Sequence, residues 1–203
     1  EILENEKRYE SIVNGRRYYV LEKSYAIFPQ RSGRLDIPRE RFNGSRGRGS
    51  IFSRKESVSA VSKPHSILVK TIPARFSGDD WLPAKNLLLQ DSWQSDLPTF
   101  RVGEPVNRSI TLSAVGLLSS ALPQLGEFKL ANAKVYDDPP TSENQVSERG
   151  ISTTQVITIG IVPTKTGELL LPEIRIPWWN TQTDKQEVAV LPQTTFTVLP
   201  STT

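Results

Sequence analysis

The 203-residue sequence contains no cysteine, no methionine and a single histidine. The lack of cysteine excludes disulfides, thiolate metal sites and cysteine nucleophiles. The histidine, His65, follows a proline in a serine-rich stretch, so the sequence offers neither a pair of histidine ligands nor a Ser/His/Asp set. No apolar run approaches the roughly 20 residues of a membrane helix. These absences argue against nucleophilic enzymes and histidine-based metal sites.

The composition points to strands. Hydrophobic residues make up 36% of the chain and charged residues 23%, which is too apolar for intrinsic disorder. The chain has 15 prolines, and its short runs rich in Val, Ile and Thr are separated by Gly or Pro. Such runs favour strands and turns over helices. The sequence therefore predicts an all-β fold with little helix.

One segment occurs twice. Residues 26–42 (AIFPQRSGRLDIPRERF) align without a gap with residues 160–176 (GIVPTKTGELLLPEIRI), at a constant offset of 134 (160 − 26 = 134). In both, a proline ends one strand and a glycine that can take positive φ reverses the chain before the next strand begins. The repeat predicts two units that share one plan.

The repeat sets the expected domain boundaries. Residues 86–200 are predicted to form a complete immunoglobulin-like β-sandwich of six or seven short strands, with strands over residues 106–114, 128–136 and 194–199. Residues 73–85, rich in Pro, Gly and Asp, read as an ordered linker. Residues 1–72 are predicted to be the C-terminal part of another such unit, truncated at its N-terminus, with strands over residues 18–28, 33–42 and 66–72. The alternative is one continuous sandwich, in which the N-terminal strands complete the C-terminal unit.

A unit that lacks its first half is expected to carry an uncovered apolar face. The side chains that form it are Tyr19, Leu21, Tyr25, Ile27, Leu35, Ile37 and Phe42. Covering several hundred Å² at about 25 cal/mol per Å² is worth several kcal/mol. We expect this face to pack on residues upstream of Glu1 in a longer parent. Without them, we expect self-association or poor order.

The strongest charge feature lies between residues 39 and 55, where six cations face one anion. The cations are Arg39, Arg41, Arg46, Arg48, Arg54 and Lys55. The glycine-rich centre reads as a solvated hairpin loop, or as a contact for anionic lipid or an acidic protein. No recognition helix or RNA-binding signature accompanies it, so nucleic acid is not expected. Arg46 and Arg48 are candidate partner-binding residues and are expected to be dispensable for folding.

Four tryptophans are expected in the linker or at strand ends: Trp81, Trp93, Trp178 and Trp179. Side chains alternate between the two faces of a strand, so Trp178 and Trp179 cannot both point into one core. One of them is expected to be exposed or to pack on a neighbouring segment. Exposure favours Trp81, Trp178 and Trp179 as anchors for a partner, whereas packing gives them a structural role.

Two acidic pairs, Asp79-Asp80 and Asp137-Asp138, are similar to the interdomain acids of calcium-binding repeat proteins. Neither belongs to a full set of calcium-ligand spacings. Nothing in the sequence places two carboxylates around a pocket for acid and base catalysis. We interpret both pairs as turn residues, and the sequence predicts no metal site and no cofactor.

Four phrases, taken in order, resemble the extracytoplasmic part of the BatD family of bacterial aerotolerance (oxygen tolerance) operon proteins: RRYYVLEKSYAIFPQRSGRLDIPRERFNG, FSGDDWLPAKNLLLQDSW, FRVGEPVNRSITLSAVGL and GIVPTKTGELLLPEIRIPWWNTQT. The resemblance implies a signal peptide, several immunoglobulin-like modules in the periplasm and a membrane helix after them. It also implies membrane proteins with von Willebrand type A domains as partners, often with a tetratricopeptide-repeat protein. The family has no assigned catalytic residues.

These observations predict a non-enzymatic scaffold for protein–protein interaction on the periplasmic side of the bacterial inner membrane, anchored outside this segment. The competing hypothesis is a carbohydrate- or peptidoglycan-binding module that uses Trp178 and Trp179 as a stacking platform. A hydrolase, the third hypothesis, requires a concave pocket with clustered carboxylates.

Overall fold

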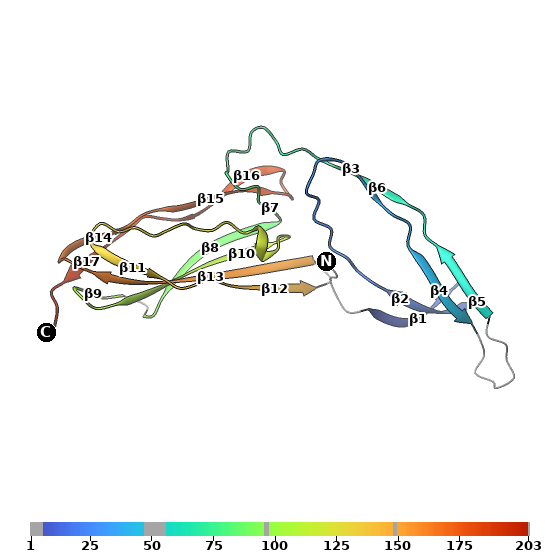
Figure 1. Cartoon of the computed structure of the whole chain (residues 1–203), viewed down its shortest axis with the longest axis horizontal. Coiled ribbons are helices and arrows are strands. Elements are labelled where there is room, and N and C mark those ends of the chain that lie inside the picture. The colour runs from blue at the N-terminus through green and yellow to red at the C-terminus, as the bar shows by residue number, and fades with distance from the viewer. Residues whose placement is uncertain (1–5, 47–55, 96–97, 148–149, 203) are drawn as a thin grey trace. The chain divides into compact units, whose positions relative to one another are not determined.

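The computed structural model describes residues 6–46, 56–95, 98–147 and 150–202 (Figure 1). It is all-β as predicted, with 60% strand and 2% helix. No helix within these ranges is long and apolar enough to cross a membrane. The chain divides into two compact units, which are described separately below: Ile27–Ala74, and Glu1–Ala26 together with Arg75–Thr203.

Most of the second of these units is a sandwich of two layers. One layer is an antiparallel sheet of order β11-β13-β10-β8, in which β12 also pairs with β13. Its strands are β8 (Asn86–Trp93), β10 (Val106–Val115), β11 (Ala133–Asp137), β12 (Thr141–Ser147) and β13 (Gly150–Pro163). Along β10 every second side chain from Arg108 to Ala114 is buried, as expected for a sheet with one covered face.

The opposite layer consists of two three-stranded sheets, of order β16-β15-β7 and β14-β17-β9. Their strands are β7 (Pro83–Ala84), β9 (Phe100–Arg101), β14 (Gly167–Leu171), β15 (Ile174–Asn180), β16 (Lys185–Leu191) and β17 (Thr194–Leu199). A short 3₁₀ helix, η1 (Ser119–Ala121), follows β10. The core has two clusters, one around Ile110 and Trp178 and one around Phe100 and Ile161.

The N-terminal residues form a separate hairpin of β1 (Lys7–Val13) and β2 (Arg16–Glu22). Its two-residue turn is Asn14-Gly15, with φ of 50° and 74°. Positive φ at both central positions is typical of the turn whose twist matches that of the flanking strands, and Asn-Gly is the favoured sequence for it.

The unit Ile27–Ala74 contains two pairs of antiparallel strands. The pair β3 (Gly33–Ile37) and β6 (His65–Val69) forms one, and the pair β4 (Arg41–Arg46) and β5 (Glu56–Val61) forms the other. His65 is exposed at the start of β6, as expected for a surface histidine.

The strand pairings of residues 7–69 (the first copy) recur in residues 141–199 (the second copy). The β1–β2 pairing matches β12–β13, β3–β6 matches β14–β17, and β4–β5 matches β15–β16. The registers agree as well: Lys7↔Glu22 with Thr141↔Val156, Gly33↔Val69 with Gly167↔Val198, and Arg41↔Val61 with Arg175↔Val190. The repeat in the sequence is therefore also a repeat of strand order and register.

The offset between the copies changes at one place. It is 134 from β1 to β4 (167 − 33 = 134) and 129 in β5 and β6 (198 − 69 = 129). The change falls between β4 and β5, which residues 47–55 connect, whereas residues 181–184 connect β15 to β16. The first copy is thus longer at this connection without any shift of the pairings on either side.

Three expected elements differ from the structure. The strand expected over residues 128–136 is confined to β11, while Phe128 and Leu130 pack against the core without joining a ladder. The strand expected to run to Phe28 ends with β2 at Glu22. Its counterpart β13 continues beyond the equivalent residue, Val156, where β10 and β11 pair with it. Pro38, which cannot donate to a ladder, lies between β3 and β4.

Both edges of β10 are occupied, one by β8 and one by β13. Among the described residues neither β1 nor β2 therefore pairs with β10, whereas a single continuous sandwich would require such a pairing. The boundary of the second unit also moves. Leu82 and Ala84 are buried in the core, so the sandwich begins within the stretch expected to be a linker.

Gly33 and Gly167 occupy the same place in the two copies, with φ of 106° and 111°. An added Cβ at Gly167 meets nothing within 4 Å, so the backbone conformation alone disfavours a side chain there. We expect Gly167→Ala to lower the free energy of unfolding by about 1–3 kcal/mol in urea denaturation followed by tryptophan fluorescence. Gly160→Ala, at a position without positive φ, is the control. An equal loss in the control would contradict the explanation.

Candidate functional site

The adjacent tryptophans on β15 are both buried. Trp178 lies in the core cluster with Ile110. Trp179 points to the other face, where Phe76 and Trp81 pack edge-on or tilted against it at centroid distances of 6.5 and 5.9 Å. Of the two predicted alternatives, packing on a neighbouring segment is therefore correct and exposure is wrong.

Polar contacts fix the segment that covers Trp179. The guanidinium carbon of Arg75 lies 4.9 Å from the ring centroid of Trp179, and Arg75 Nη2 donates a hydrogen bond to the carbonyl of Asp184 (2.8 Å). The indole Nε1 donates to Asp184 Oδ1 (3.2 Å). With both indoles enclosed, Trp178 and Trp179 form no stacking platform for a sugar, and Trp81 is half-buried in the same cluster.

The predicted basic contact lies largely outside the described residues. The backbone of Arg46 closes β4, but its side chain is not described, and Arg48 belongs to residues 47–55. Arg46 and Arg48 therefore stay predictions as partner-binding residues. The flanking Arg39 and Arg41 are exposed.

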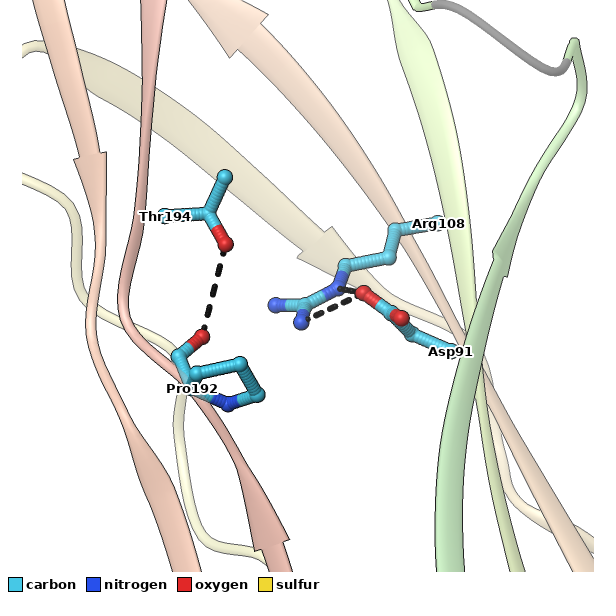
Figure 2. A network of polar contacts seen from close by, with 4 residues as sticks. All are labelled: Asp91, Arg108, Pro192 and Thr194. Atoms are coloured by element: carbon cyan, nitrogen blue, oxygen red, sulfur yellow. Dashed lines mark hydrogen bonds and ion pairs between the residues drawn. The ribbon is translucent and has the colours of Figure 1, made fainter.

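An ion pair joins a buried cation of the sandwich, Arg108, to Asp91, whose side chain is 32% exposed (Figure 2). Arg108 on β10 is 4% exposed, and its Nε and Nη2 donate to Oδ2 of Asp91 on the adjacent strand β8, at 3.1 and 2.8 Å. The guanidinium carbon also lies 5.4 Å from the ring centroid of Trp93. Nearby in Figure 2, the Thr194 hydroxyl donates to the Pro192 carbonyl (3.4 Å).

The position of Arg108 explains its role. It follows Val106, which packs on the cluster around Phe100, and precedes Ile110, which belongs to the cluster around Trp178. The ion pair thus separates the two halves of the core. Two donors to one carboxylate oxygen hold the Arg108 side chain in place, so its guanidinium is engaged within the fold.

The acidic pair Asp79-Asp80 lines a shallow hollow of about 200 Å³. Arg175 and Pro177 of β15 line it too, so a cation is present in the same hollow. Within the described ranges, no group of three or more His, Cys, Asp or Glu side chains is placed to hold a metal ion. The hollow has no histidine in its lining, and its only carboxylates are those of the adjacent Asp79 and Asp80.

The β1–β2 hairpin presents large apolar side chains to solvent, among them Tyr9, Ile12, Val13, Tyr18, Tyr19 and Leu21. Tyr19 is 77% exposed and Leu21 is 44% exposed. Their counterparts at the offset of 134, Thr153 and Gln155 of β13, are buried in the sandwich. Positions that the second copy encloses are thus open in the hairpin, and they carry larger apolar groups there.

The same contrast holds in the unit Ile27–Ala74. Ile27 is 51% exposed, whereas its counterpart Ile161 is fully buried. Phe42 is exposed and its counterpart Ile176 is buried. Of the apolar side chains expected to be uncovered, only Leu35 and Ile37 are half-buried. The sequence repeat identified these positions before the structure did.

Charged groups stiffen the hairpin. Glu22 accepts a hydrogen bond from the Tyr9 hydroxyl (3.0 Å), which raises the pKa of Tyr9 because a phenolate beside a carboxylate is disfavoured. The hydrogen bond from Arg8 to Glu6 lowers the pKa of Glu6, and Lys23 adds to this effect. All of these groups are near the surface, so they contribute modestly to stability.

Comparison with known proteins finds no matching family model, no matching curated protein and no matching solved structure.

Proposed function

We propose that this chain is a non-enzymatic scaffold for protein–protein interaction, with the β1–β2 hairpin as its docking surface, so that Tyr19 and Leu21 bind a partner and not the residues upstream of Glu1 that the sequence analysis expected to cover them. The observation that carries the proposal is the exposure of Tyr19 and Leu21 at positions that the second copy buries. Contiguous exposed apolar side chains on a folded element are typical of sites that contact another protein. The charged groups inside the sandwich serve packing, since Arg108 and Asp91 are joined to each other.

The phrases that resemble the BatD family extend this proposal to its setting. On that basis the chain is a periplasmic segment of a membrane-anchored, BatD-like oxygen tolerance protein. It docks with envelope proteins that carry von Willebrand type A domains, which are often accompanied by a tetratricopeptide-repeat protein. The matching strand registers of the two copies support tandem immunoglobulin-like units as its architecture. A carbohydrate-binding role is not favoured, because Trp178 and Trp179 are buried.

The test is affinity capture of membrane proteins on the immobilised 203-residue chain. We expect proteins with von Willebrand type A domains to be recovered. Replacing Tyr19→Asp and Leu21→Asp together should reduce their recovery at least about tenfold, because charged groups at the centre of an apolar contact cost more than 1.4 kcal/mol.

The matched control is Tyr136→Asp with Leu170→Asp, the same residue types on strands β11 and β14 of the sandwich, 60% and 48% exposed. This control should bind like the unchanged chain. Recovery of no von Willebrand type A protein removes the partner from the proposal. Equal losses in the two double variants remove the hairpin as its docking surface.

A further inference from the structure

The second copy shows how a strand equivalent to β2 is completed. Strand β13 is bordered by β12 on one edge, and β10 pairs with its other edge from Ser152 to Ile161. In the part of the chain that the structure describes, β2 pairs with β1 alone. Every second residue of β2 therefore directs its N–H and C=O groups away from β1, as at any edge strand.

The positions can be matched residue by residue, because β1–β2 and β12–β13 share one register at an offset of 134. The stretch of β13 from Ser152 to Val156 pairs with β10 from Val115 to Thr111. Its equivalent in the hairpin is Tyr18 to Glu22. The open edge of β2 thus has the length and direction needed for one antiparallel strand.

The side chains on this edge define what such a strand must carry. In the second copy Thr153 lies opposite Ala114, and Gln155 lies opposite Leu112. The equivalents of Thr153 and Gln155 are the exposed Tyr19 and Leu21. A strand with apolar residues at every second position, small opposite Tyr19 and aliphatic opposite Leu21, would pack beside both side chains on the same face of the sheet.

We propose that the free edge of β2 is a strand-acceptor site, and that its occupant is a strand of the partner protein with the alternating apolar pattern of β10, added antiparallel to Tyr18–Glu22. Main-chain hydrogen bonds hold such a strand and its alternate side chains select it, as in other cases of strand addition. This inference rests on the proposed function, because it names the chemistry by which the same hairpin binds.

The main experiment supplies such a strand in the register of the second copy. Residues 82–134 are fused ahead of Glu1, since the junction then corresponds to Lys134–Val135. Hydrogen exchange of the Tyr18–Glu22 amides should slow by about 100-fold relative to the 203-residue chain, as amides become paired on both edges of β2. The control fusion carries Ile110→Asp and Leu112→Asp in the added segment only. Its Tyr18–Glu22 amides should exchange as fast as those of the 203-residue chain.

A second experiment adds a synthetic peptide of residues 104–117 to the 203-residue chain. It tests the strand-acceptor site even if the fusion fails to fold. Slower exchange at Tyr18–Glu22 on addition of this peptide, and not of its Ile110→Asp, Leu112→Asp version, supports the inference. Unchanged exchange in a folded fusion, or with the peptide at saturating concentration, overturns it. Protection that rises with the concentration of the chain alone also overturns it, because the occupant is then a second copy.

The outcomes separate this inference from the proposed function. If Tyr19→Asp with Leu21→Asp abolishes capture of the partner while added strands leave the amides unprotected, the hairpin binds through its side chains alone. The strand-acceptor site is then wrong and the docking surface stands.

Discussion

Replacing Asp91 by leucine should lower the free energy of unfolding of the sandwich by about 3 kcal/mol. The substitution leaves the guanidinium of Arg108, which is 4% exposed, without the carboxylate that accepts two of its hydrogen bonds. The Asp91 side chain is 32% exposed, so the cost comes from Arg108, whose buried guanidinium keeps its charge without a counterion in a medium of low dielectric constant. Urea denaturation followed by tryptophan fluorescence measures the change, since all four tryptophans lie between residues 81 and 179.

Two controls identify the origin of this loss. The double variant Asp91→Leu with Arg108→Met should recover most of the stability, because an apolar pair of similar volume replaces the ions. Glu173→Ala removes the partner of Arg175 in an ion pair on the surface, and should cost less than about 1 kcal/mol. A double variant as unstable as Asp91→Leu alone would mean that the loss comes from packing and not from the unpaired charge.

The second large effect comes from one substitution made at equivalent positions of the two copies. Ile161→Ala should lower the free energy of unfolding by about 3–4 kcal/mol, because it opens a cavity beside Phe100 and Leu169 in a closed core. Ile27→Ala should cost less than about 1 kcal/mol, since Ile27 is 51% exposed. Isoleucine therefore contributes differently to stability at the two equivalent positions.

Circular dichroism and tryptophan fluorescence during denaturation follow the whole chain and the sandwich, respectively. Hydrogen exchange in residues 27–46 supplies a local measure for the first copy. A cost for Ile27→Ala as large as that for Ile161→Ala would show that this position is enclosed in solution, and would argue against uncovered apolar groups in the first copy.

Period-two alternation predicted several strands closely. The expected strand from residue 106 to 114 is β10 with one more residue, and β17 has the expected bounds. Alternation failed for a segment that has no neighbouring strand to pair with. Phe128 and Leu130 have the apolar spacing of a strand but no ladder partner, because the sequence carries no information on which backbone groups lie beside them.

The role of Arg108 needed the register as well. The sequence marks it as a cation on an otherwise apolar face, but does not say that Asp91 of the neighbouring strand lies beside it. The covering of Trp179 is a similar case, since Phe76 and Trp81 are about a hundred residues away along the chain. The exposure of Tyr19 and Leu21 was easier to predict, because the repeat shows which positions of the first copy lack the residues that cover their counterparts in the second.

The connection between β4 and β5 is longer than the equivalent connection between β15 and β16. This difference determines where a fluorophore or an affinity tag is best attached. The residues that connect β15 to β16 are held by hydrogen bonds. Asp184 accepts from Trp179 and Arg75, and Asn180 Oδ1 accepts from the amides of Gln182 and Thr183. Extra residues there would break these contacts. Between β4 and β5 the chain already carries five more residues while Arg41 still pairs with Val61. Labels placed between residues 47 and 55 would therefore leave both strand registers intact.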